Sequence, residues 1–127
     1  MAEKQKLLIV DDHDTLRELL KMTLEFSDFE LFEATDANEA LSMVAEIEPD
    51  VIILDIMMPG EMDGVDVCRR LKANPKTAHI KIILLSAKGQ AEDIRVGGEA
   101  GADAYFVKPF SPMSLLESIK VERYRDS

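Results

Sequence analysis

The chain has 127 residues, of which 46% are hydrophobic and 31% charged, and its formal net charge at pH 7 is -10. That composition predicts one soluble globular domain with a single core. The acidic balance argues against nucleic-acid binding by this chain, and no apolar segment is long enough to cross a bilayer. The single cysteine, Cys68, cannot form an internal disulfide and fits a reducing compartment. We therefore expect a cytoplasmic protein without nucleic-acid or membrane partners of its own.

Short apolar segments alternate with segments of helical spacing along the chain. In order, strands are predicted at residues 7–10, 30–34, 51–54, 80–85 and 104–107. A helical pattern follows each strand. Asp14 or Thr15 is predicted to cap the first helix, and Ser111 to cap the last. The helical pattern of the fourth, at residues 91–100, is weak. The third strand is apolar throughout, which suits a strand buried on both faces of a sheet.

This alternation of strands and helices determines the predicted architecture. Five strand–helix units predict one parallel sheet with helices on both faces and right-handed crossovers. The fold class is therefore α/β, a (βα)5 single domain over residues 1–122. The polar residues 123–127 form a tail or begin a linker.

Polar side chains stand at the carboxyl ends of four predicted strands. They are Asp11 and Asp12 after the first strand, Asp55 after the third, Ser86 after the fourth and Lys108 after the fifth. In a parallel sheet these ends share one edge, where ligands bind. Three crowded carboxylates repel one another unless a cation neutralises them, and oxygen ligands suit Mg²⁺. Because Lys and Ser donate hydrogen bonds to oxyanions, a carboxylate beside them can act as a nucleophile toward phosphorus.

Several short motifs accompany these residues. They are Ile9-Val10-Asp11-Asp12, Asp55-Ile-Met-Met-Pro59, Met62-Asp-Gly64, Leu85-Ser86-Ala87 and Gly101-Ala-Asp-Ala-Tyr-Phe-Val-Lys108-Pro109-Phe110. Together they resemble the motifs of response-regulator receiver domains, the CheY-like family of two-component signalling. The resemblance covers essentially the whole chain. It implies a flavodoxin-like, doubly wound sheet of five parallel strands.

The resemblance also implies a phosphorylation-dependent signalling module. Asp55 would accept a phosphoryl group from the phosphohistidine of a sensor histidine kinase or phosphotransfer protein. Asp12 and Asp55 would bind Mg²⁺ directly, together with the backbone carbonyl of Met57, and Asp11 would act through water. Such a module is not an enzyme beyond its own phosphotransfer and autodephosphorylation.

Further roles implied by the resemblance concern the other strand ends. Lys108 would pair with the phosphoacceptor and then with the phosphoryl oxygens, while Ser86 and the backbone near Ala87 would bind the phosphoryl group. Tyr105 would be a switch that turns inward as Ser86 moves, and the peptide bond before Pro109 would be cis. Phosphorylation would change the surface formed by the fourth helix, fifth strand and fifth helix, where an effector or a second copy would bind.

Plainer interpretations stand beside these roles. Asp12 can be a helix cap, Ser86 a turn residue and Tyr105 a packing residue, and we interpret His13 and His79 as surface residues. For the whole chain, one alternative is a degenerate receiver that acts as a constitutive binding scaffold. The other is a phosphoaspartyl hydrolase that acts on external substrates.

Two features depart from the common pattern of the family. The loop after Pro59 is one residue longer than the usual spacing before Met62. Gly97 and Gly98 place two residues of low helix propensity in the fourth helix. We therefore expect that helix to be short, irregular or mobile, unless Gly98 merely allows close packing against a neighbour.

Overall fold

The computed structural model describes residues 4–25 and 27–120, and in them five strands alternate with five helices. The elements are β1 (Lys6–Val10), α1 (Asp14–Leu24), β2 (Glu30–Ala34), α2 (Ala37–Ile47), β3 (Val51–Asp55), α3 (Gly64–Ala73), β4 (Lys81–Ser86), α4 (Ala91–Glu99), β5 (Ala104–Val107) and α5 (Pro112–Lys120). The predicted domain end at residue 122 and the predicted tail at 123–127 lie outside the described residues.

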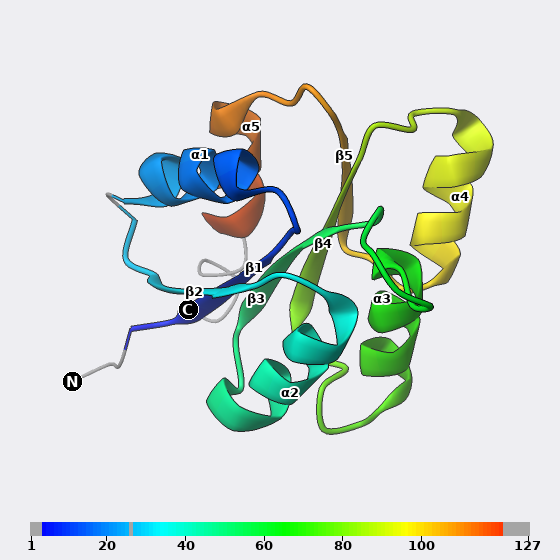
Figure 1. Cartoon of the computed structure of the whole chain (residues 1–127), viewed down its shortest axis with the longest axis horizontal. Helices are drawn as coiled ribbons and strands as arrows, with labels where there is room; N and C mark the ends of the chain where they lie inside the picture. Colours follow the sequence, from blue (N-terminus) through cyan, green and yellow to red (C-terminus); the bar gives the residue numbers. More distant parts are fainter. Residues whose placement is uncertain (1–3, 26, 121–127) are drawn as a thin grey trace.

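The strands form one parallel sheet in the order β2-β1-β3-β4-β5. Figure 1 shows α1 and α5 on one face of this sheet and α2 and α3 on the other. The flavodoxin-like α/β fold predicted from the sequence is therefore confirmed. None of the described helices has the length and apolar character needed to cross a bilayer.

The third strand shows how one apolar segment serves two cores. Ile52 and Leu54 of β3 belong to the cluster that includes the inner faces of α2 and α3. Val51 and Ile53 belong to the opposite cluster, with leucines of α1 and α5. Successive side chains of a strand point to opposite faces, so an uninterrupted apolar run is what a doubly covered strand requires. The two cores hold β1 and β3 side by side at the centre of the sheet.

The start of α1 differs from the prediction. His13 occupies the N-cap position and makes no side-chain capping bond, so the predicted cap by Asp14 or Thr15 is wrong. The backbone N–H of His13 instead donates to Asp11 Oδ1 at 2.7 Å. The turn between β1 and α1 is therefore fastened to a carboxylate at the end of β1.

The fourth helix is short and regular, and its two glycines face different surroundings. α4 is an uninterrupted α-helix of nine residues, so the prediction of a short helix is confirmed and that of an irregular one is wrong. A Cβ at Gly97 would lie 2.8 Å from the ring of Tyr105, whereas a Cβ at Gly98 would meet nothing within 4 Å. Gly97 therefore allows close packing, and the alternative that assigned this role to Gly98 is wrong. Mobility of the helix stays a prediction.

The open space beside Gly98 leads to a stability prediction. Gly98→Ala is expected to raise the free energy of unfolding by about 0.5–1 kcal/mol, because alanine is a better helix former and meets no neighbour. Chemical denaturation would measure the change. Gly97→Ala is the matched control and should not stabilise, since its methyl group displaces the Tyr105 ring. A loss of stability in Gly98→Ala would contradict the prediction.

Candidate functional site

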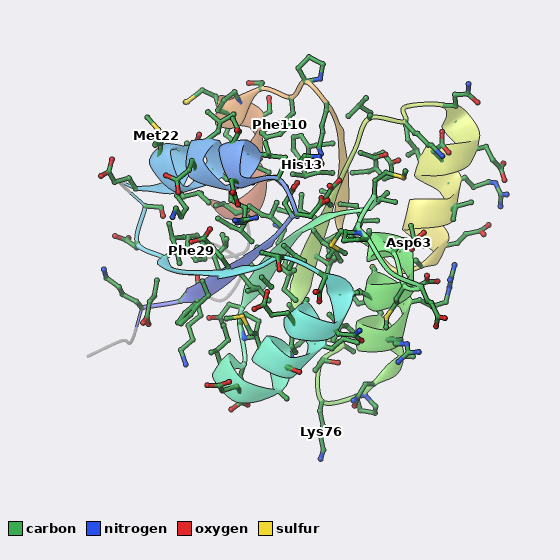
Figure 2. All side chains as sticks on the ribbon, viewed as in Figure 1. His13, Met22, Phe29, Asp63, Lys76 and Phe110 are labelled. Atoms are coloured by element: carbon green, nitrogen blue, oxygen red, sulfur yellow. The ribbon has the colours of Figure 1, made fainter. Side chains whose placement is uncertain are left out.

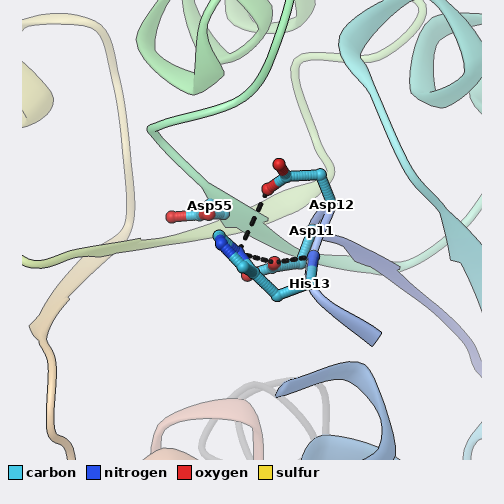
Figure 3. A group of neighbouring side chains, drawn as sticks. All are labelled: Asp11, Asp12, His13 and Asp55. Atoms are coloured by element: carbon cyan, nitrogen blue, oxygen red, sulfur yellow. Dashed lines mark hydrogen bonds and ion pairs between the residues drawn. The ribbon is translucent and has the colours of Figure 1, made fainter. Parts of the chain in front are cut away.

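Three carboxylates meet at the carboxyl edge of the sheet (Figure 3). Asp11 and Asp12 follow β1, and Asp55 ends β3, the strand paired with β1. Val10 is the partner of Leu54 across these two strands, so the residues after them are brought side by side. Asp11 and Asp55 are 0% and 1% exposed, whereas the side chain of Asp12 is 33% exposed. Two buried acids and one accessible acid therefore share this edge.

Lys108 follows β5 and places its ammonium group between two of the carboxylates. Its Nζ lies 3.1 Å from Asp55 Oδ1 and 3.6 Å from Asp11 Oδ2. Its backbone N–H donates to the carbonyl of Ser86 at 2.8 Å, and the Lys108–Pro109 peptide bond is cis. One ammonium among three carboxylates leaves the edge negatively charged, so it attracts cations.

Two buried oxygens at this edge have no hydrogen-bond partner among the described residues. They are Asp11 Oδ2 and Asp55 Oδ2. Burial, and then the charge of Asp11, raise the pKa of Asp55 from 3.8 to about 6, although Lys108 acts in the opposite direction. Asp11, Asp12, His13 and Asp55 offer ligand atoms that all lie within 4.8 Å of one another. These groups fit a hard divalent cation such as Mg²⁺, because it would satisfy the buried oxygens.

Ser86 and Tyr105 are linked through the backbone of one loop residue. Ser86 ends β4 and is buried, and its Oγ accepts a hydrogen bond from the N–H of Lys88 at 3.0 Å. The half-buried Tyr105 donates its O–H to the carbonyl of Lys88 at 2.8 Å. Ala87, between Ser86 and Lys88, is exposed. An open groove of about 200 Å³ is lined by Ser86, Tyr105 and Met57 among others.

The loop after Asp55 ends at Gly64, close to the backbone at the end of β3. The N–H of Gly64 donates to the carbonyl of Ile56 at 3.0 Å, and a Cβ at Gly64 would lie 2.4 Å from the carbonyl oxygen of Asp55. Gly60 adopts a φ of 101°, a conformation that glycine allows at little cost. The longer loop thus turns at Gly60 and closes at Gly64. The side chain of Met57 is 56% exposed, and the role of its carbonyl as a metal ligand stays a prediction.

His13 belongs to this cluster, which the sequence interpretation missed. Its side chain is 65% exposed, as expected of a surface residue, but its Nδ1 lies 3.0 Å from Asp11 Oδ1 and 3.2 Å from Asp12 Oδ1. Figure 2 shows His13 at the beginning of α1. Its position directly after Asp11-Asp12 was the available signal. His79 is exposed and lies before β4, at the opposite end of that strand.

Comparisons with known proteins identify the family of the chain. The family model of the response regulator receiver domain matches residues 7–120. The chain is 38% identical over 97% of its length to the DNA-binding response regulator MtrA of Mycolicibacterium smegmatis, and covers 52% of that protein. It is 41% identical over 90% of its length to the phosphate regulon transcriptional regulatory protein PhoB of Pseudomonas aeruginosa, and covers 49% of it. The chain thus spans about half the length of these curated relatives.

Solved structures of receiver domains resemble this chain as well. The signal receiver domain of a signal transduction histidine kinase from Syntrophus aciditrophicus matches with a TM-score of 0.84 and 35% identity, over 91% of this chain and 87% of that one. The chemotaxis response regulator CheY4 of Vibrio cholerae matches with a TM-score of 0.84 and 30% identity, over 93% of this chain and 98% of that one. The chain therefore belongs to the response regulator receiver domain family of two-component signalling.

Proposed function

We propose that residues 1–122 form a phosphorylation-dependent receiver in which Asp55 accepts a phosphoryl group. The donor is the phosphohistidine of a sensor histidine kinase or phosphotransfer protein. The observation that carries the proposal is the state of the Asp55 carboxylate: Oδ1 is bound to Lys108, while Oδ2 is buried without a hydrogen-bond partner. One oxygen of this carboxylate is the nucleophile. It forms the new bond to phosphorus as the phosphorus–nitrogen bond breaks, and the electron pair stays on the donor imidazole.

The neighbouring residues would hold the charges that this transfer creates. Lys108 fixes one carboxylate oxygen and pairs with a phosphoryl oxygen afterwards, and the Ser86 hydroxyl and Ala87 N–H are further donors. Asp11, Asp12, Asp55 and the Met57 carbonyl would hold Mg²⁺, whose positive charge stabilises phosphoryl oxygens. The two buried carboxylate oxygens that accept no hydrogen bond from the described residues, Asp11 Oδ2 and Asp55 Oδ2, support this assignment.

The signal would leave through Ser86 and Tyr105. If Ser86 turns toward the phosphoryl group, its Oγ loses the hydrogen bond from Lys88, to which Tyr105 is also bonded. Tyr105 then turns inward, and the surface of α4, β5 and α5 changes its fit for an effector or a second copy. This cycle of phosphotransfer and autodephosphorylation is the chain's only reaction. The free, buried Cys68 supports a cytoplasmic location.

Acetyl phosphate with Mg²⁺ provides the test, read by the mass of the intact protein. We expect one phosphoryl adduct on the wild-type chain and none on Asp55→Asn. Asp14→Asn, which changes an exposed aspartate at the start of α1, is the matched control and should keep the adduct. The absence of any adduct on the wild type would favour a binding scaffold. Turnover of many unrelated phosphoesters would favour a hydrolase.

A further inference from the structure

The imidazole of His13 extends the carboxylate cluster with a nitrogen atom. Its Nδ1 lies 3.0 Å from an oxygen of Asp11 and 3.2 Å from an oxygen of Asp12, and Figure 3 shows the ring pointing toward these carboxylates. His13, Asp11, Asp12 and Asp55 each offer a ligand atom, and these four atoms lie within 4.8 Å of one another. A single ion could therefore contact all four groups.

The two nitrogen–oxygen separations of His13 match those of neighbouring ligands that share an ion. Neighbouring ligands of an octahedral ion with bonds of about 2.1 Å are roughly 3 Å apart, and opposite ligands roughly 4 Å apart. The observed nitrogen–oxygen distances correspond to such neighbours. The buried Oδ2 atoms of Asp11 and Asp55, which lack hydrogen-bond partners, are an independent sign that the cluster is built for a cation. Because the ring is 65% exposed, it can adjust to an ion without disturbing the core.

The kind of ion follows from the ligand atoms. Mg²⁺ prefers oxygen ligands and keeps several waters, so an imidazole nitrogen adds little to its binding. First-row transition ions bind imidazole well, and their affinity for mixed nitrogen and oxygen sites rises along the series from Mn²⁺ to Cu²⁺. A site of three carboxylates and one imidazole therefore differs in selectivity from a site of carboxylates alone.

We propose that His13 Nδ1 is a ligand in the cation site, so that this receiver binds divalent first-row transition ions more tightly, relative to Mg²⁺, than its carboxylates alone would. The inference rests on the cation site of the proposed function and adds His13 to it. Occupancy of the site then responds to ions such as Mn²⁺ and Co²⁺ as well as to Mg²⁺.

Titration calorimetry of the full chain with Co²⁺ and separately with Mg²⁺ tests the assignment. We expect His13→Gln to lower the ratio of Co²⁺ affinity to Mg²⁺ affinity by about tenfold or more, because it removes the imidazole ligand. His79→Gln is the matched control, since it removes the other histidine, which lies at the far end of β4. It should leave the ratio unchanged. The exposure of both side chains makes both variants compatible with folding.

Nitrogen NMR of the histidine rings gives a second readout. Diamagnetic Zn²⁺ should shift the Nδ1 resonance of His13 and leave His79 unchanged. An unchanged affinity ratio in His13→Gln, with no shift at His13, would overturn the inference and mean that the ring only donates a hydrogen bond to Asp11. If Mg²⁺ still binds and Asp55 is still phosphorylated, the proposed function stands in that case. Failure of the wild type to bind any of these ions would instead overturn the cation site itself.

Discussion

Replacing Asp55 by asparagine is expected to raise the free energy of unfolding of the metal-free protein by about 2 kcal/mol at neutral pH. In the folded chain, burial and the neighbouring Asp11 raise the pKa of Asp55 from 3.8 to about 6. Holding this group ionised in the folded state therefore costs free energy, at most roughly 3 kcal/mol for that elevation of the pKa. Asparagine has the same shape and no charge. The pKa of about 6 already includes the opposing effect of Lys108. Because an amide only approximates a protonated carboxyl group, the net gain is smaller than that limit.

The dependence on pH follows from the direction of this pKa change. Well below pH 3.8 the wild-type carboxyl is protonated in both folded and unfolded chains, so the variant has no advantage there. As the pH rises, the unfolded chain releases its proton first, and the stability of the wild type falls until the pH passes about 6. The advantage of Asp55→Asn should therefore grow between these limits and stay constant above them. Chemical denaturation in the presence of a chelator, at a series of pH values, measures it.

Two controls separate this effect from a general change of charge. Glu61→Gln removes an exposed carboxylate from the loop after β3, and its effect should stay within about 0.5 kcal/mol at every pH. Mg²⁺ should stabilise the wild type more than Asp55→Asn, because in the proposed site the ion would bind the folded state through that carboxylate. If Asp55→Asn is less stable than the wild type at neutral pH without metal, the charge of Asp55 does not lower the free energy of unfolding, and the prediction is wrong.

The fold could be predicted from the sequence because the strands, apart from β2 with its two glutamates, are short and mainly apolar. β2 and β5 have the predicted bounds, β1 and β3 each differ from the prediction by one residue at one end, and β4 is shifted by one residue at both ends. Parallel strands bring their carboxyl ends to one edge, so the meeting of Asp11, Asp55 and Lys108 follows from topology alone. No contact between distant side chains had to be known for this step.

Finer features depend on backbone conformations that residue types do not determine. The approach of His13 to Asp11 and Asp12 results from the turn that precedes α1, whose cap was predicted wrongly. The link from Ser86 to Tyr105 runs through the backbone of Lys88, a residue without a distinctive pattern. Such details require the path of the loop, because a backbone group bonds in the same way whatever its side chain.

The loop after Asp55 gives the second prediction with a large expected effect. Gly64→Ala should lower the free energy of unfolding by about 2–3 kcal/mol, because the new methyl group has no room. The ideal Cβ would lie 2.4 Å from the carbonyl oxygen of Asp55 and 2.8 Å from the Cα of Ile56. Both neighbours are backbone atoms, so relief requires the end of β3 or the beginning of α3 to move. Chemical denaturation at neutral pH measures the loss.

The same displacement should slow phosphorylation by acetyl phosphate, since the Asp55 backbone carries the proposed nucleophile. A shift of even a fraction of an ångström in a reacting group can slow a transfer by about tenfold or more. Gly98→Ala makes the same chemical change in α4, where a Cβ meets nothing within 4 Å, and it should leave the phosphorylation rate intact. Wild-type stability and rate in Gly64→Ala would mean that the loop relaxes without moving Asp55. The contrast between the two variants thus tests whether close contact at Gly64 holds the carboxylate in position.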